Sequence, residues 1–150
     1  MHVLRTILAL IALTGAALAQ SPPPKAANEQ VVGTVKGGIA FVEPWARATP
    51  GGSRVGAAFV EVKAAAGVSD RIVSASSPAA GVVELHDMIK DGAMMKMRRV
   101  EGIDIPEGQS VKLQPGGFHM MLMDLKGPLV AGETLKLTIV LEKAGAVEIL

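Results

Sequence analysis

The chain has 150 residues, of which 49% are apolar, 19% are charged and only 3% are aromatic. A chain of this length forms one domain of ordinary size, with a core built mainly from aliphatic side chains and methionine. The formal net charge of +1 provides no basic surface, so neither nucleic acid nor an anionic membrane is expected as a partner. The absence of cysteine excludes disulfide bonds and thiolate ligands.

The first residues have the features of an export signal. Arg5 supplies a positive charge, an apolar run follows it, and Ala17-Leu18-Ala19 has the pattern of a cleavage site. The apolar run is shorter than the roughly 20 residues that a membrane-spanning helix needs, so we expect cleavage rather than anchoring. The predicted organisation is a cleaved signal peptide (1–19), a proline-rich flexible linker (20–37) and a folded periplasmic domain (38–150).

From Gly38 onward, short segments rich in β-branched residues alternate with Gly, Pro, Asp and Ser. No segment keeps a helical period over a dozen residues, so the pattern predicts an all-β sandwich or barrel. Trp45 is expected in the core or as a plug at one end of the barrel, because the fold has few other aromatic side chains. The expected strands are 55–62, 71–75, 82–88, 94–100, 110–113, 118–125 and 134–141, with 147–150 as a last strand or a frayed end.

The strands on either side of Asp91-Gly92 are expected to form a hairpin. Asp-Gly is a preferred pair for a two-residue type I′ turn. If these two residues form the turn, His86 lies directly opposite Met97, with Cβ atoms about 4.5–5.5 Å apart. The same register opposes Glu84 to Arg99 and Asp87 to Lys96, which are two favourable pairs of charges.

Histidine and methionine are concentrated in one window of the sequence. Loss of Met1 and His2 with the leader leaves seven of the eight methionines and two of the three histidines, all between residues 86 and 123. In the strand that follows Phe118, side chains 119, 121 and 123 share one face. We therefore expect two pairs of metal donors, His86 with Met97 and His119 with Met121.

Imidazole and thioether together form a soft, neutral ligand set, which suits Cu(I). Calcium and magnesium require oxygen ligands, and structural zinc sites are completed by cysteine or carboxylate. A blue-copper centre requires a cysteine thiolate, so an electron carrier of that kind is excluded. The donor types thus indicate a Cu(I) site.

The strand pattern predicts different positions for the other methionines. Met88 and Met123 share faces with the expected ligands, so each is either an alternative ligand or a packing residue, with packing preferred. Met94 and Met120 are expected in the core, since methionine commonly fills irregular gaps there. Met95 shares the face of Met97 near the tip of the hairpin and stays unassigned.

These residues resemble the signature of the periplasmic copper chaperone family called PCu(A)C (DUF461). That signature is a His, ten residues, a Met, twenty-one residues and then His-x-Met. Here residues 87–96 separate His86 from Met97, residues 98–118 separate Met97 from His119, and Met121 completes the pattern. The likeness also includes Pro44-Trp45-Ala46-Arg47 and Leu113-Gln114-Pro115-Gly116-Gly117.

The resemblance implies a cupredoxin-like Greek-key β-barrel that binds a single Cu(I). The implied ligands are His86, Met97, His119 and Met121. The implied role is delivery of copper to the Cu(A) centre of cytochrome c oxidase or a related acceptor, often alongside Sco-type proteins. An enzyme is not expected, because the mature chain has only two histidines and no tyrosine for an open redox site. Copper storage or buffering, and a metal-free assembly module with a Met-rich patch, stay as alternatives.

Overall fold

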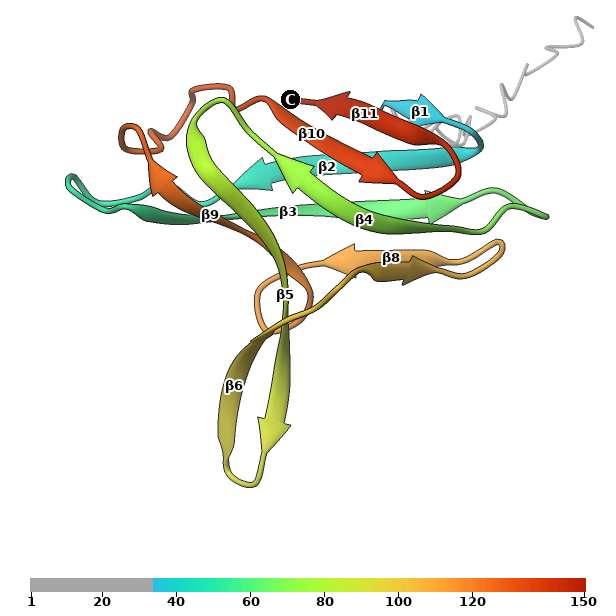
Figure 1. Cartoon of the computed structure of the whole chain (residues 1–150), viewed down its shortest axis with the longest axis horizontal. Coiled ribbons are helices and arrows are strands. Elements are labelled where there is room, and N and C mark those ends of the chain that lie inside the picture. Colours follow the sequence, from blue (N-terminus) through green and yellow to red (C-terminus); the bar gives the residue numbers. More distant parts are fainter. Residues whose placement is uncertain (1–33) are drawn as a thin grey trace, which may run out of the picture.

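The computed structural model describes residues 34–150 (Figure 1). The predicted signal peptide and most of the predicted linker lie outside the described residues. The described part consists of strands and turns without a helix, so the all-β prediction is confirmed. No helix that could span a membrane is found in this part of the chain.

Eleven strands make up the described fold. They are β1 (Val35–Lys36), β2 (Ile39–Ala46), β3 (Val55–Ala64), β4 (Asp70–Ser76), β5 (Ala80–Asp91), β6 (Met94–Arg99), β7 (Ile103–Ile105), β8 (Ser110–Leu113), β9 (His119–Leu125), β10 (Leu137–Leu141) and β11 (Gly145–Ile149). β1, β2 and β7 were not predicted from the sequence. β2 contains a proline, and β1 and β7 are too short to show an alternating pattern.

Eight of the strands follow the order β1-β2-β3-β9-β5-β4-β10-β11, and all neighbours are antiparallel. Thr34 Oγ1 donates to the carbonyl of Glu148 at 3.3 Å, and Lys36 Nζ donates to the carbonyl of Ala146 at 2.6 Å. These bonds join β1 to β11, the two ends of the sheet (Figure 1). The sheet is therefore a nearly closed barrel, and the predicted cupredoxin-like architecture is confirmed.

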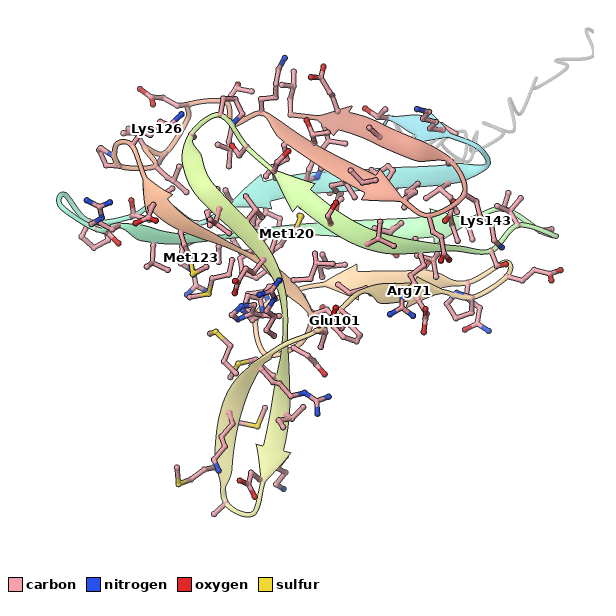
Figure 2. All side chains as sticks on the ribbon, in the orientation of Figure 1. Arg71, Glu101, Met120, Met123, Lys126 and Lys143 are labelled. Carbon is pink, nitrogen blue, oxygen red and sulfur yellow. The ribbon has the colours of Figure 1, made fainter. Side chains whose placement is uncertain are left out.

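Alternation along each strand decides which side chains enter the core. In β9, Met120 and Leu122 are fully buried, whereas Met123 is half-buried on the outer face (Figure 2). The prediction that Met120 lies in the core is confirmed. The same prediction for Met94 is wrong, because β5 and β6 extend beyond the barrel and leave this side chain 63% exposed.

A β-bulge in β2 turns Trp45 to the outer face of the barrel. Val42 pairs with Glu61 and Trp45 pairs with Phe59, so β2 carries one extra residue between these pairs. Glu43, within the bulge, has a positive φ of 49°. An extra residue reverses the inward and outward alternation that follows it. Trp45 is consequently 48% exposed, and the prediction that it lies in the core is wrong.

The hairpin turn between β5 and β6 differs from the predicted one. Its two central residues are Gly92 and Ala93, so Asp91 pairs with Met94. A type I′ turn needs positive φ at both central residues, whereas only Gly92 has it here, with φ 62°. Positive φ at the first position alone is typical of a type II′ turn.

This turn displaces the predicted register of the hairpin by two residues. His86 lies opposite Arg99 and Met97 lies opposite Met88, so the predicted opposition of His86 and Met97 is wrong. Because side chains alternate with a period of two, the displacement leaves each of them on its predicted face. The observed charge pairs of the hairpin are Glu84 with Arg99 and Asp91 with Lys96.

A buried carboxylate connects β4 to the turn between β10 and β11. Asp70 accepts hydrogen bonds from the backbone N–H groups of Arg71 at 2.7 Å, Lys143 at 2.9 Å and Ala144 at 3.0 Å. Burial alone would raise its pKa, but these three bonds and the charge of Lys143 outweigh burial and lower the pKa of Asp70 from its ordinary 3.8.

We predict that Asp70→Asn lowers the free energy of unfolding by about 1.5–3 kcal/mol near neutral pH, since bonds to a charged acceptor are lost. Because the folded pKa is depressed, this stabilisation is present above pH 3.8 and is lost as the pH falls below it. Urea unfolding of both proteins, near neutrality and in acid, measures the effect. Asp104→Asn is the control, because Asp104 forms an exposed ion pair of small value. A difference between wild type and Asp70→Asn that is the same at both pH values would contradict the prediction.

Candidate metal centre

The two histidines of the described chain meet where β5 leaves the barrel. The first part of β5 pairs with β9, and its last part forms the protruding hairpin with β6 (Figure 1). His86 is paired on both sides, with His119 of β9 and with Arg99 of β6. The centroids of the two imidazole rings lie 5.6 Å apart, with their planes at 59°.

Hydrogen bonds determine which ring nitrogens are free. His119 Nδ1 lies 2.9 Å from the carbonyl of Gly117, and His86 Nε2 lies 2.9 Å from Glu84 Oε2. Both partners only accept, so each of these nitrogens carries the proton in the neutral ring. The lone pairs therefore reside on His119 Nε2 and His86 Nδ1. In residues 34–150, His86 Nδ1 is the one buried side-chain nitrogen or oxygen without a hydrogen-bond partner.

A buried lone pair without a donor is costly, so it requires an explanation. Such a nitrogen can donate its lone pair to a metal ion. Metal-binding histidines commonly donate their other N–H to a carboxylate or carbonyl oxygen. Glu84 and the carbonyl of Gly117 serve in this way for His86 and His119. Glu84 also forms an ion pair with Arg99, whose Nη1 lies 3.3 Å from Glu84 Oε1, and this pair connects its carboxylate to the hairpin.

Sequence reasoning assigned Glu84 only to the hairpin register and missed this contact. The available signal was its position two residues before His86, which places both side chains on one face of a strand.

The two predicted methionine ligands lie on the same face as the histidines. Met121 follows His119 by two residues on β9 and is opposite Glu84 on β5. Met97 is diagonal to His86 across the hairpin, at a typical spacing of about 7–8 Å that long side chains can cover. Met97 is 49% exposed, whereas His119 is 5% exposed, so the face combines one buried imidazole with an accessible thioether.

An aromatic pair adjoins His119 on this face. The rings of Trp45 and Phe59 stack with centroids 4.4 Å apart, and Phe59 lies 6.4 Å from the ring of His119. Phe59 belongs to the outward series of β3 yet is only 3% exposed. The bulge at Glu43 therefore places Trp45 against Phe59, which adjoins His119, and the sequence pattern did not reveal this arrangement.

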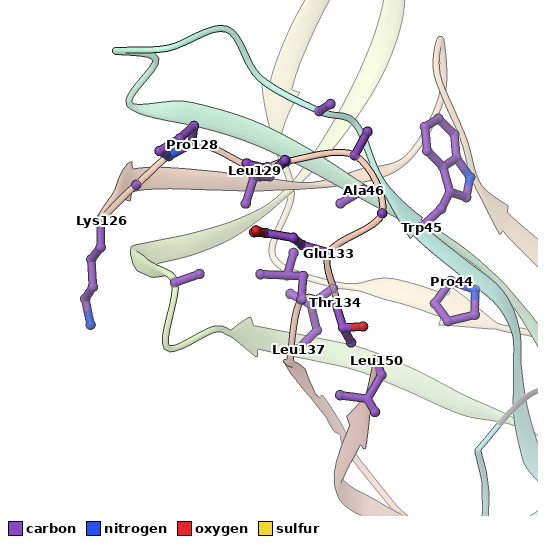
Figure 3. A pocket seen from close by; sticks show the side chains of 17 residues that line it. Pro44, Trp45, Ala46, Lys126, Pro128, Leu129, Glu133, Thr134, Leu137 and Leu150 are labelled. Carbon is purple, nitrogen blue, oxygen red and sulfur yellow. The ribbon is translucent and has the colours of Figure 1, made fainter.

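A pocket of about 540 Å³ lies elsewhere, between the end of β2, the 126–135 loop and Leu150 (Figure 3). No histidine or methionine lines it, so this pocket is separate from the histidine pair. Within residues 34–150, no three His, Asp or Glu side chains gather in a way that could hold a metal ion. A metal at the histidine pair would therefore need thioether sulfur as a further donor.

The fold is that of a PCuAC-type domain. Residues 39–150 match the family described as "Putative lipoprotein LpqE-like", and the chain belongs to this family. A relative from Leifsonia xyli subsp. xyli, "Putative lipoprotein Lxx21020", is 37% identical over 131 residues, which cover 87% of this chain and 75% of the relative. Both descriptions are of lipoproteins, a class that lies outside the cytoplasm.

Two solved structures are similar to this chain. The copper-bound PCuAC domain from PmoF2 is 29% identical, with a TM-score of 0.67 over 78% of this chain and 92% of that domain. CuI-DR1885 from Deinococcus radiodurans is 29% identical, with a TM-score of 0.59 over 83% of this chain and 80% of that chain. These matches confirm the resemblance to PCuAC proteins and the expectation that the chain is not an enzyme.

We predict that the two histidines adopt opposite tautomers in the metal-free protein. His86 should carry its proton on Nε2 and His119 on Nδ1, because Glu84 and Gly117 offer only acceptors. Long-range ¹H–¹⁵N spectra of the imidazoles distinguish protonated from bare ring nitrogens. Glu84→Leu should abolish the preference of His86 and leave that of His119 unchanged. A bare Nε2 on His86 of the wild-type protein would contradict the prediction.

Proposed function

We propose that this protein is a periplasmic Cu(I) carrier that binds one ion and delivers it to the Cu(A) centre of cytochrome c oxidase or a related acceptor. The proposed ligands are His86, Met97, His119 and Met121. The observation that carries the proposal is the buried, unpartnered Nδ1 of His86 beside the ring of His119. The copper-bound state of the similar PmoF2 domain and of DR1885 supports the choice of metal.

The electrostatics of the face suit a monovalent soft cation. Two imidazoles and two thioethers are neutral, so they leave the charge of Cu(I) uncompensated. The carboxylate of Glu84, held against His86, places one negative charge close to the proposed ligands. A divalent ion would keep more uncompensated charge and would lack the oxygen ligands that hard cations require.

The position of the ligands fits a carrier that must release its cargo. His86, His119 and Met121 stand on barrel strands, whereas Met97 stands on the exposed hairpin. A thioether on an exposed strand can be replaced by a ligand of the acceptor while the barrel ligands still hold the ion. An acceptor with thiolate ligands binds Cu(I) more strongly than neutral donors do, so the free energy of copper transfer to it is negative.

Location outside the cytoplasm agrees with the predicted signal peptide (1–19). The relatives are described as lipoproteins, but none of the 150 residues here is a cysteine that could carry a lipid. We therefore propose a periplasmic protein without membrane insertion after cleavage of its signal peptide.

Anaerobic titration with Cu(I) against a chromogenic chelator tests the site. We expect one tightly bound equivalent in the wild type, because the proposed site offers four soft donors to one ion. His86→Ala, His119→Ala, Met121→Ala and Met97→Ala should each lose it or release it to the chelator. Met94→Ala is the matched control, since Met94 is exposed on the other face of the hairpin. A tightly bound equivalent that survives His86→Ala would contradict the proposed ligands, and no binding at all would favour the metal-free assembly module.

Delivery is tested by mixing the Cu(I)-loaded protein with a purified, copper-free Cu(A) domain of an oxidase. We expect copper to move to the Cu(A) domain, because thiolates hold Cu(I) more strongly than thioethers. Separation of the two proteins followed by metal analysis measures the transfer, and a Sco-type protein serves as a second acceptor. Retention of copper by the donor with both acceptors would favour storage or buffering.

A further inference from the structure

The hairpin of β5 and β6 extends away from the barrel (Figure 1), and its methionines are exposed to solvent. All six residues of β6 are exposed, and Met94, Met95 and Met97 are 63%, 53% and 49% exposed. Apolar side chains on an exposed strand gain little from burial. Core packing therefore does not explain why this strand is rich in methionine.

Three methionines of the hairpin share the face that carries His86. Met97 lies directly opposite Met88, and Met95 lies on the same face, diagonal to Met88. Directly opposed Cβ atoms lie about 4.5–5.5 Å apart, and diagonal neighbours are about 7–8 Å apart. Methionine is unbranched and flexible, so three sulfurs at these spacings can converge on one ion.

The other side chains of the hairpin provide few competing donors. Lys90, on the same face, is protonated and offers no lone pair. The carboxylates of Glu84 and Asp91 form ion pairs with Arg99 and Lys96. The remaining carboxylate of β5, Asp87, lies on the other face of the hairpin. Thioethers with no free carboxylate on their own face select Cu(I) over hard divalent cations.

We propose that Met88, Met95 and Met97 form a second, weaker Cu(I) site, the hairpin thioether site. It rests on the proposed function, because Met97 also belongs to the main site with His86. An ion held at the hairpin reaches the main site when His86 and His119 replace Met88 and Met95 while Met97 stays bound. The copper remains Cu(I) throughout, so ligands exchange without any redox step. The hairpin thioether site thus receives and releases the ion at the exposed end of the protein.

The test is anaerobic titration of the full protein with Cu(I), followed by NMR of ¹³C-labelled methionine methyl groups. The first equivalent should shift the signals of Met97 and Met121. Beyond the first equivalent, a second ion competes with the first for Met97, so the signals of Met88 and Met95 should shift while that of Met94 stays unmoved. Met88→Leu/Met95→Leu should lose this second event and keep the first, whereas Met94→Leu should keep both. Leucine is close to methionine in volume, and circular dichroism verifies the fold of each variant.

The outcomes separate this site from the main one. In His86→Ala/His119→Ala, Met88 and Met95 should shift from the first addition of Cu(I). If the wild type behaves in the same way, the main site is wrong and the hairpin site stands. If the wild type binds one equivalent through its histidines, and further Cu(I) leaves Met88 and Met95 unmoved or shifts Met94 equally, the hairpin site is overturned.

Discussion

The site depends on the double pairing of His86, which lies between His119 of β9 and Arg99 of β6. Antiparallel pairing brings the two imidazoles together although 32 residues lie between them in the sequence. The same residue marks the end of the barrel part of β5 and the beginning of the hairpin. A change in this pairing would therefore alter the relation of both histidines to the hairpin methionines.

Hydrogen bonds then determine which nitrogen of each imidazole carries the proton and which has a free lone pair. Glu84 and the carbonyl of Gly117 each accept an N–H, which leaves one bare nitrogen on each histidine. The core packs behind β9 through Met120 and Leu122, and Trp45 stacks on Phe59 beside His119. The imidazoles are thus held on strands supported from within, whereas the thioethers of β6 have no such support. A half supported by the core and an exposed half suit the proposed Cu(I) carrier, which would both hold and release an ion.

Alternation with a period of two explains which sequence predictions succeeded. It placed Met120 inside the barrel and grouped His119 with Met121, without any knowledge of the neighbouring strands. It also assigned His86 and Met97 to one face of the hairpin, and this survived an error of two residues in their register. The error arose because Asp-Gly favours a type I′ turn, whereas Gly92 and Ala93 form the turn here.

The sequence by itself determined the all-β class, the positions of most strands and the unusual set of histidine and methionine donors, because residue type and local alternation are properties of the chain alone. Only the tertiary structure decided the hydrogen-bonded state of each histidine, the role of Glu84, the outward position of Trp45 and the exposure of Met94. These features depend on a bulge, on a turn type and on how far β5 extends past the barrel. Such features are set by contacts between strands that lie far apart in the sequence, which no local pattern records.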